Sequence, residues 1–281
     1  MLAQLLAKLG LKRTAVKNLL RFGAVSVNGS PSRQFDLPLA AGDQIVVGDL
    51  QSAAASNRLQ AARIRIVHED SAIIAVDKPS GLLTVATDDN KTDTLFARLR
   101  AFLTERDGSR AAHPHVVHRL DRETSGLVLF AKSAELKQTL QASWPEVRKT
   151  YWAVVEGLPT PPEGTVRSYL VESKALRVYS SPHPTEGGRE ATTHYRTQQF
   201  GDGCALVEID LETGRKHQIR VHLADLGCPV TGDQRYGAKL DLCGRLALHA
   251  GSLAFPHPDG GAEIRLESPL PPPLQRLFKK S

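Results

Sequence analysis

The stretch HRLDRETSGLVLFAK, residues 118 to 132, divides into two halves of opposite character. Residues 126–131 are apolar and rich in residue types that favour strands, which predicts a buried strand. Residues 118–125 are densely polar, and the sequence Thr124-Ser125-Gly126 predicts a turn whose backbone N–H groups can approach a ligand. A polar segment is therefore expected at the mouth of a rigid strand.

Asp121 lies in the polar half, flanked by Arg119 and Arg122. If the backbone is extended here, Arg119 and Asp121 point to one side and His118 points to the other. An ionised carboxylate beside a cation suits a site that receives an anionic substrate. The alternative is a solvated loop whose charges form surface ion pairs of little energetic value.

A second polar motif, ETGRKHQIRVH, occupies residues 212–222. Thr213 is expected to cap a helix whose core face includes Ile219 and which ends before Gly227. Arg220 follows Ile219 by about a hundred degrees of helical rotation, so it can emerge at the edge of that core face. An arginine at such an edge is usually an exposed residue whose aliphatic part packs on the surface.

Two shorter strands carry polar residues at their ends. Tyr151 is expected to open the strand 152–155, where it either packs half-buried or offers an aromatic face on which a planar ring can stack. Lys78 follows the apolar strand 73–76 and is either a contact to phosphate or an ordinary surface lysine.

Periodicity predicts helices at residues 94–103 and 134–143. It also predicts two antiparallel neighbouring strands, at residues 192–197 and 204–211. Residues 160–188, which are rich in Pro, Ser and Gly, give few signals.

The N-terminal part of the chain carries six Lys and Arg residues before its first acid. A helix is expected over residues 2–9, followed by a second helix with Thr14 as its cap. The second helix has a basic stripe at steps of four residues on its outer face. The stripe consists of Arg13, Lys17 and Arg21. Strands are expected at residues 24–27 and 44–47, with Asn28-Gly29 as a hairpin turn.

Composition limits the class of protein. The 281 residues leave room for one large and one small domain, and the net charge of +6 favours a polyanionic partner. No apolar run approaches the roughly 20 residues of a spanning helix, and no charged leader with a cleavage site begins the chain. The three cysteines include no close pair, which argues against a zinc knuckle or disulfide framework and fits a reducing cytoplasm.

The segments His118-Arg119-Leu120-Asp121 and Thr124-Ser125-Gly126 resemble the catalytic signature of the RluA-type pseudouridine synthases. Residues 213–220, 149–151 and 245–258 are similar to further motifs of that family. The resemblance covers about residues 64–278. It implies an α+β fold with a mixed, largely antiparallel sheet, and an isomerase that flips out a uridine of RNA and converts it to pseudouridine without cofactor or metal.

The resemblance also implies roles for individual residues. Asp121 is the essential carboxylate, either as nucleophile or as base at the sugar. Arg220 would stabilise its ionised form, and Tyr151 would stack on the uracil and relay a proton at C5. Arg119 would fill the space left by the base or hold a phosphate. Further substrate-binding residues implied by the same resemblance are His118, Arg215, His217, Gln218 and Leu248.

The two N-terminal helices and the following β-ribbon resemble an S4 RNA-binding domain. The expected organisation is an S4-like domain at residues 1–50, a linker rich in Ala, Ser and Gln at 51–63, and a catalytic domain at 64–281. The basic stripe would then contact RNA, ribosomal RNA being favoured over transfer RNA, and the protein is expected to act as a monomer.

Other classes of function fit the sequence less well. A glycoside-type hydrolase needs two carboxylates across the scissile bond, and only Glu123 lies near Asp121. A non-catalytic RNA-binding protein needs the basic faces but has no use for Asp121. A metal site at His113, His115 and His118 is rejected because Pro114 interrupts the segment and no carboxylate or cysteine completes the ligand set.

Overall fold

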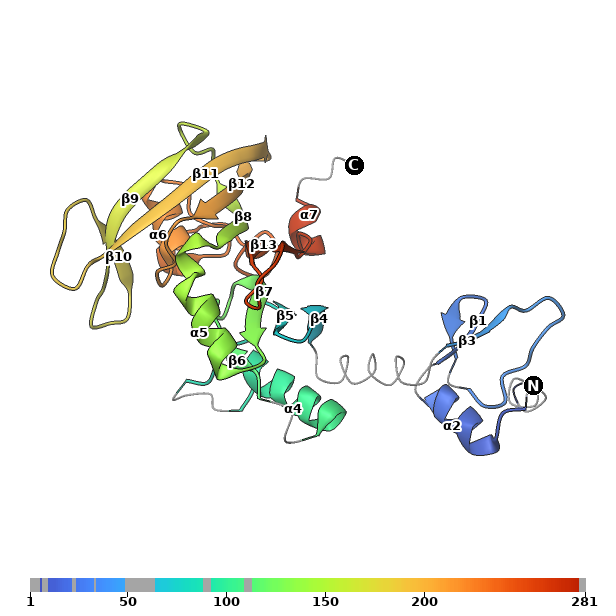
Figure 1. The fold of residues 1–281 in the computed structure, drawn as a ribbon. Helices are drawn as coiled ribbons and strands as arrows, with labels where there is room; N and C mark the ends of the chain where they lie inside the picture. Colours follow the sequence, from blue (N-terminus) through green and yellow to red (C-terminus); the bar gives the residue numbers. More distant parts are fainter. Residues whose placement is uncertain are drawn as a thin grey trace. The chain divides into compact units, whose positions relative to one another are not determined.

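A computed structural model describes residues 6, 10–21, 24–32, 34–48, 64–87, 92–108 and 113–277. The chain divides into two compact units: Met1–Arg63 with Ala101–Ala111, and Ile64–Arg100 with Ala112–Ser281 (Figure 1). The helix expected over residues 2–9 and the linker expected at 51–63 lie outside the described residues, apart from Leu6.

The small unit contains helix α2 (Arg13–Arg21) and a three-stranded antiparallel sheet in the order β2-β1-β3. Its strands are β1 (Val25–Val27), β2 (Ser30–Pro31) and β3 (Ile45–Val47). The predicted hairpin turn is confirmed, because Asn28 and Gly29 both have positive φ, at 52° and 78°. The apolar face of α2 packs on Ala24 and Val25.

Two expectations for α2 meet different outcomes. The helix begins at Arg13, so Thr14 lies inside its first turn and the predicted Thr14 cap is wrong. Arg13 and Lys17 are exposed, as predicted for the basic stripe, whereas the side chain of Arg21 lies outside what the structure describes. The assignment of this unit as an S4-like domain stays a prediction.

The large unit is built on an eleven-stranded sheet in the order β10-β9-β11-β12-β8-β13-β7-β5-β4, with β14 paired to β13 and β6 paired to β7. Every paired neighbour is antiparallel except β13 and β7, so the sheet is mixed and largely antiparallel, as predicted. The strands are β4 (Arg65–Glu69), β5 (Ile73–Lys78), β6 (His115–Val116), β7 (Ser125–Ala131), β8 (Arg148–Glu156), β9 (Glu163–Glu172), β10 (Val178–Ser181), β11 (Arg189–Gly201), β12 (Cys204–Leu211), β13 (Leu248–Pro256) and β14 (Glu263–Glu267).

Strand β7 is the apolar half of the opening stretch, and all seven of its residues are buried. It pairs with β5, β6 and β13. Gly126 has φ of 114°, and a Cβ at this position would lie 2.2 Å from the carbonyl oxygen of Ala250. Glycine therefore permits the close parallel approach of β7 and β13. The polar residues 118–124 enter the sheet immediately before this point.

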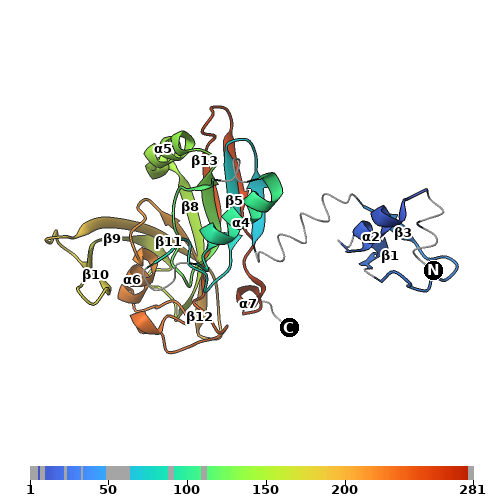
Figure 2. The same ribbon diagram turned by 90° about the horizontal axis from the view of Figure 1, so that it is seen from below.

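The helices of the large unit lie against different parts of the sheet (Figure 2). Helix α5 packs against β6 and β7, and α6 packs against β10 and β11. Its other helical segments are α7 (Pro272–Gln275) and the 3₁₀ turns η1 (Trp144–Glu146) and η2 (Gln234–Tyr236), with α5 spanning Ala134–Ala142 and α6 spanning Gln218–Asp225. Helix α4 (Leu95–Asp107) begins in the large unit, and its residues from Ala101 onward are assigned to the small one. None of the helices formed by described residues is both long and apolar enough to span a membrane.

Candidate active site

A cavity of about 1240 Å³ opens in the large unit, and a smaller pocket of about 90 Å³ adjoins it. Asp121, Tyr151 and Arg220 line both spaces. They come from the loop before β7, from β8 and from α6. The fold thus brings the three predicted catalytic residues together in one place.

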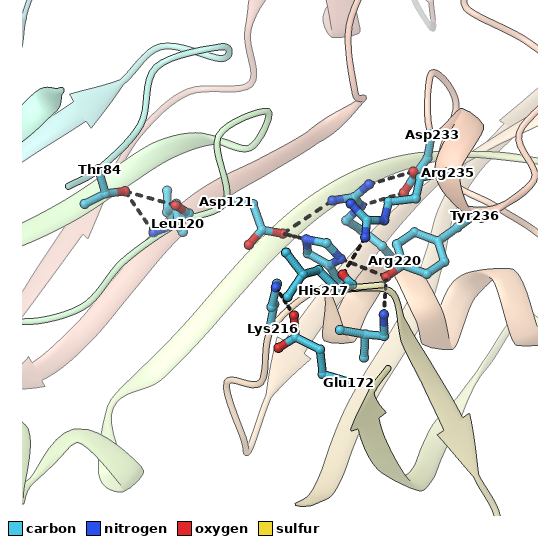
Figure 3. A network of polar contacts seen from close by, with 12 residues as sticks. Thr84, Leu120, Asp121, Glu172, Lys216, His217, Arg220, Asp233, Arg235 and Tyr236 are labelled. Carbon is cyan, nitrogen blue, oxygen red and sulfur yellow. Dashed lines mark hydrogen bonds and ion pairs between the residues drawn. The ribbon is translucent and has the colours of Figure 1, made fainter. Parts of the chain in front are cut away.

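The main chain beside Asp121 is held by a buried threonine (Figure 3). The Oγ1 of Thr84 donates to the carbonyl oxygen of Leu120 at 3.0 Å and accepts from the N–H of Leu120 at 3.2 Å. Both groups of Leu120 are thereby satisfied away from water. The side chain of Asp121 remains 30% exposed, so its carboxylate is available to a ligand.

Lys78 secures the other end of the same loop. Its Nζ donates to the carbonyl oxygens of Pro79, Leu82 and Arg122 at 2.7 to 3.1 Å, and the residue is fully buried. Burial lowers the pKa of this lysine to about 7. Both expectations for Lys78 are wrong, because it is neither a surface residue nor placed to meet RNA.

Arg220 is buried rather than exposed at an edge, since only 9% of its side chain is accessible. Its Nε and Nη2 donate to the two carboxylate oxygens of Asp233 at 2.6 and 2.7 Å. The remaining nitrogen, Nη1, lies 3.7 Å from Oδ2 of Asp121. Burial alone would lower the pKa of Arg220, but the hydrogen bond and charge of Asp233, together with Asp121, raise it. The guanidinium therefore carries its charge toward Asp121.

His217 approaches the same oxygen. It precedes α6 in the left-handed conformation, with φ of 56°, and its Nε2 lies 3.8 Å from Oδ2 of Asp121. Its Nδ1 lies 2.7 Å from the hydroxyl oxygen of Tyr236. Burial lowers the pKa of His217, which favours the neutral imidazole, although the charge of Asp121 opposes this. Figure 3 shows His217 and Arg220 directed at Asp121 from one side.

Thr213 and Gln218 organise the loop that leads to these donors. Thr213 does not cap α6, because its hydroxyl donates to Oε1 of Gln218 at 2.9 Å. The same Oε1 accepts from the N–H of Arg215, and Nε2 of Gln218 donates to the carbonyl oxygen of Thr192. Gln218 is buried with these partners and holds residues 213–217. It also lines the smaller pocket, and its contact to substrate stays a prediction.

Tyr151 lies within β8 rather than at its start, because the strand begins at Arg148. Its register partner in β12 is Ile209, and its partner in β13 is Ala250. Burial, followed by the charge of Asp121, raises the pKa of the Tyr151 hydroxyl. The phenol is therefore protonated at neutral pH, and Tyr151 lines both spaces beside Asp121.

His118 lines the large cavity but its ring is engaged by the protein. Its Nε2 accepts the N–H of Leu129 at 3.1 Å, and the ring stacks on Trp144 with centroids 4.5 Å apart. Burial lowers the pKa of His118 to about 3, so the ring is neutral. His118 thus fixes the loop against β7, and its role in substrate binding stays a prediction.

The remaining predicted substrate residues reach the cavities. Arg119 and Arg215 are exposed and line both spaces, and Leu248 forms part of the wall of the smaller one. Cations outnumber carboxylates around the large cavity, which suits an RNA strand. The cationic lining residues are Arg119, Arg122, Lys149, Arg215, Lys216, Arg220 and Arg235, and the acidic ones are Asp121, Glu123 and Glu172.

Sequence reasoning missed Thr84, Asp233 and Tyr236 as part of this site. Asp233 and Tyr236 lie in the segment Gly232–Gly237, whose two glycines both have positive φ and could have marked a constrained turn. No local signal singles out Thr84, because its partner Leu120 lies 36 residues away.

Comparison with known proteins identifies the family of the chain. Residues 72–225 match the family described as RNA pseudouridylate synthase. The chain is 35% identical over 272 residues to the uncharacterised RNA pseudouridine synthase YlyB of Bacillus subtilis, covering 95% of this chain and 88% of that protein. It is 34% identical over 287 residues to ribosomal large subunit pseudouridine synthase D of Xanthomonas campestris, covering 95% and 83%.

A solved structure agrees with these matches. Human RNA pseudouridylate synthase domain containing 4 superposes with a TM-score of 0.66 and 26% identity, covering 80% of this chain and 94% of that one. The chain therefore belongs to the RNA pseudouridine synthase family and is an isomerase that acts on uridine in RNA.

Proposed function

We propose that this enzyme converts a uridine of ribosomal RNA to pseudouridine, with Asp121 as the essential carboxylate. The observation that carries the proposal is the convergence of Asp121, Arg220 and Tyr151 on one cavity with a mainly cationic lining. The carboxylate of Asp121 is partly exposed, and two nitrogen atoms, Nε2 of His217 and Nη1 of Arg220, approach it.

The reaction is an isomerisation in which no atom is gained or lost. The bond between N1 of uracil and C1′ of ribose breaks, the base turns, and C5 bonds to C1′. The proton that leaves C5 is balanced by a proton gained at N1. Asp121 serves as nucleophile or as base at the sugar, and either role uses the carboxylate that faces the Arg220 guanidinium.

Tyr151 is placed to relay a proton at C5 of the flipped uracil. Burial raises the pKa of its hydroxyl, so the phenol is protonated at neutral pH. Its ring supplies a stacking surface for the flipped uracil, and its hydroxyl is a hydrogen-bond donor. Arg119 is exposed at the cavity, where it can hold a phosphate or occupy the place vacated by the base.

Ribosomal RNA is preferred over transfer RNA as the target for two reasons. Several similar proteins are named ribosomal large subunit pseudouridine synthase D. The small unit, which we regard as an S4-like RNA-binding module, presents the exposed cations Arg13 and Lys17 on one helix. Phosphate contacts of this kind add affinity without naming a sequence. We further propose that the enzyme acts in the cytoplasm as a monomer, since all three central residues come from one chain.

The test compares the wild-type protein with Asp121→Asn on ribosomal and transfer RNA prepared from cells that lack this gene. Wild type should form pseudouridine in the ribosomal RNA, and the variant should form none while binding the same RNA with nearly unchanged affinity. Turnover by Asp121→Asn would exclude Asp121 as the essential group. Pseudouridine found only in the transfer RNA would overturn the choice of target.

A further inference from the structure

Asp233 and Tyr236 are buried beside the active site without lining either cavity. They belong to one short segment, since Asp233 precedes η2 and Tyr236 ends it. The main-chain carbonyl of Asp233 accepts the N–H of Tyr236 at 3.0 Å and that of Ala238 at 3.1 Å, which fixes the two residues relative to each other. Neither side chain is placed to touch a substrate, so any effect on the reaction passes through other residues.

Asp233 determines how the Arg220 guanidinium is oriented. The two-point contact from Nε and Nη2 to both carboxylate oxygens fixes the plane of the group as well as its position. With that plane fixed, Nη1 is the nitrogen that is left to face Oδ2 of Asp121, at 3.7 Å. The ring of Tyr236 lies 5.0 Å from the guanidinium carbon and supports it from a second direction.

Tyr236 determines which nitrogen of His217 carries the proton. The hydroxyl oxygen of Tyr236 accepts the N–H of Val178 at 3.3 Å, so the hydroxyl proton is free to be donated to Nδ1 of His217 at 2.7 Å. Burial raises the pKa of Tyr236, which keeps this proton on the phenol. A neutral His217 whose Nδ1 accepts has its own proton on Nε2, the nitrogen that faces Asp121.

We propose that Asp233 and Tyr236 are positioning residues that direct two N–H donors, Nη1 of Arg220 and Nε2 of His217, to the same oxygen of Asp121. The inference rests on the proposed role of Asp121. Both contacts involve Oδ2, which leaves Oδ1 as the oxygen that meets the sugar or its proton. Separations of 3.7 and 3.8 Å exceed a hydrogen bond, and such distances commonly shorten when substrate closes the site.

The competing explanation is that the contacts of Asp233 with Arg220 and of Tyr236 with His217 only hold α6 against η2. A purely structural role would lower stability without a specific effect on the reaction. Tyr195 provides a matched control, because it is also buried and its hydroxyl donates to the carbonyl oxygen of Pro161 at 3.2 Å, yet it lines neither active-site space. Tyr236→Phe and Tyr195→Phe each remove one buried hydroxyl and leave the ring in place.

The experiment measures single-turnover rates at saturating RNA, RNA affinity and urea stability for wild type, Tyr236→Phe, Tyr195→Phe and Asp121→Asn. Tyr236→Phe should lower the rate on the order of tenfold with RNA affinity unchanged, because the donor facing Asp121 is no longer fixed. Tyr195→Phe should keep the wild-type rate. Equal rates for the two phenylalanine variants, whether both normal or both reduced, would overturn the inference.

Asp121→Asn separates this inference from the proposed function. If Asp121→Asn is inactive and Tyr236→Phe is fully active, the proposed role of Asp121 is supported and the proposed role of Tyr236 is wrong. An active Asp121→Asn would instead overturn the role of Asp121, and the inference with it.

Two further measurements apply even if Tyr236→Phe fails to fold. Proton–nitrogen correlation spectra of wild type labelled with ¹⁵N-histidine should place the His217 proton on Nε2, and a proton on Nδ1 would overturn the proposal. His217→Gln keeps a donor near the Nε2 position, whereas His217→Leu has none, so Gln should be at least about tenfold faster than Leu. Because both variants place a side chain in the same left-handed conformation, equal rates would contradict the inference.

Discussion

Asp121 is held from two sides by different physical means. On the loop side, Thr84 and Lys78 hold the main chain of residues 120 and 122 through hydrogen bonds to backbone groups. On the arginine side, Arg220 and His217 face the carboxylate, and each of them is fixed by another side chain. The first set determines where the carboxylate lies, and the second determines which charges and donors surround it.

This difference predicts two kinds of mutational effect. A lost backbone contact on the loop side should lower stability and rate together, because the position of Asp121 depends on a folded loop. A lost donor on the arginine side should lower the rate even when stability is restored, because the electrostatic environment of the reaction has changed.

The largest effect is expected for Arg220→Met. The rate should fall about 10²- to 10³-fold through loss of the charge beside Asp121. Stability should also fall by about 3 to 5 kcal/mol, since Asp233 is left as an unpaired buried carboxylate. The double variant Arg220→Met with Asp233→Leu should recover most of the stability but none of the rate, as measured by urea unfolding and single turnover. If the double variant also recovered the rate, the pair of Arg220 and Asp233 would serve stability alone and not the reaction.

Lys78→Met should have the next largest effect, now on the loop side. It leaves three carbonyl oxygens without their donor, at a cost of about 2 to 4 kcal/mol. The folded pKa of about 7 lies below the ordinary value of 10.5, so the wild type should gain stability as pH rises from about 7 toward 10. The advantage of wild type over the variant should therefore widen in this range. A constant difference in urea unfolding between pH 7 and pH 9.5 would mean that Lys78 titrates normally.

The two sides also differ in how far the sequence predicts them. Strand β7 follows from an apolar run, so Asp121 could be placed shortly before a buried strand. The turn predicted at Thr124-Ser125-Gly126 is wrong, because Ser125 and Gly126 already belong to β7. The turn lies one step earlier, where the N–H of Thr124 donates to the carbonyl oxygen of Asp121 at 3.2 Å. The contacts of Lys78 to Arg122 and of Gln218 to Thr192 could not be predicted, because each partner is a backbone carbonyl, 44 and 26 residues away in the sequence. Arg220 was found through resemblance alone, and helical geometry placed it wrongly at an exposed edge.

Strands β9 and β10 show another limit of sequence reasoning. They lie at one end of the sheet, and most residues of β9 are partly or fully exposed. The alternation of hydrophobic and polar residues is therefore weak in both strands. They also lie in a segment rich in Pro and Ser, which is typical of a loop. Strand β10 nevertheless contributes to the site, because the N–H of Val178 donates to the hydroxyl oxygen of Tyr236.

A smaller effect, similar on both sides, is expected at acid pH. His118 belongs to the loop side and His222 to α6, and burial lowers their pKa values to about 3 and about 4. Both values lie below the ordinary 6.5, so stability present above pH 6.5 should be lost as pH falls, by about 2 kcal/mol per histidine at pH 5. His118→Gln and His222→Gln should each lose less stability than wild type between pH 7 and pH 5 in urea unfolding. A variant that loses as much as wild type would show that its histidine is not held neutral.

The smallest effect is expected for Thr84→Val, which retains the shape of the side chain and removes one hydroxyl. That hydroxyl both donates to and accepts from Leu120, so the variant leaves a buried N–H and a buried carbonyl unpaired. Stability should fall by about 1 to 2 kcal/mol. The rate should fall about tenfold, because Asp121 is the next residue and a shift of a fraction of an ångström displaces its carboxylate. RNA affinity should not change, since Thr84 is buried and carries no charge that could bind phosphate.

Thr84→Ser is the matched control, because it keeps the hydroxyl and loses only the methyl group. Serine should retain most of the rate, although it is less constrained in rotamer than threonine. If valine and serine give the same rate, the hydroxyl does not position Asp121, and the loop is held by Lys78 and the turn alone. If valine lowers the rate with no change in stability, the loop side would show the effect that is expected of the arginine side. The proposed difference between backbone contacts and side-chain contacts around Asp121 would then be wrong.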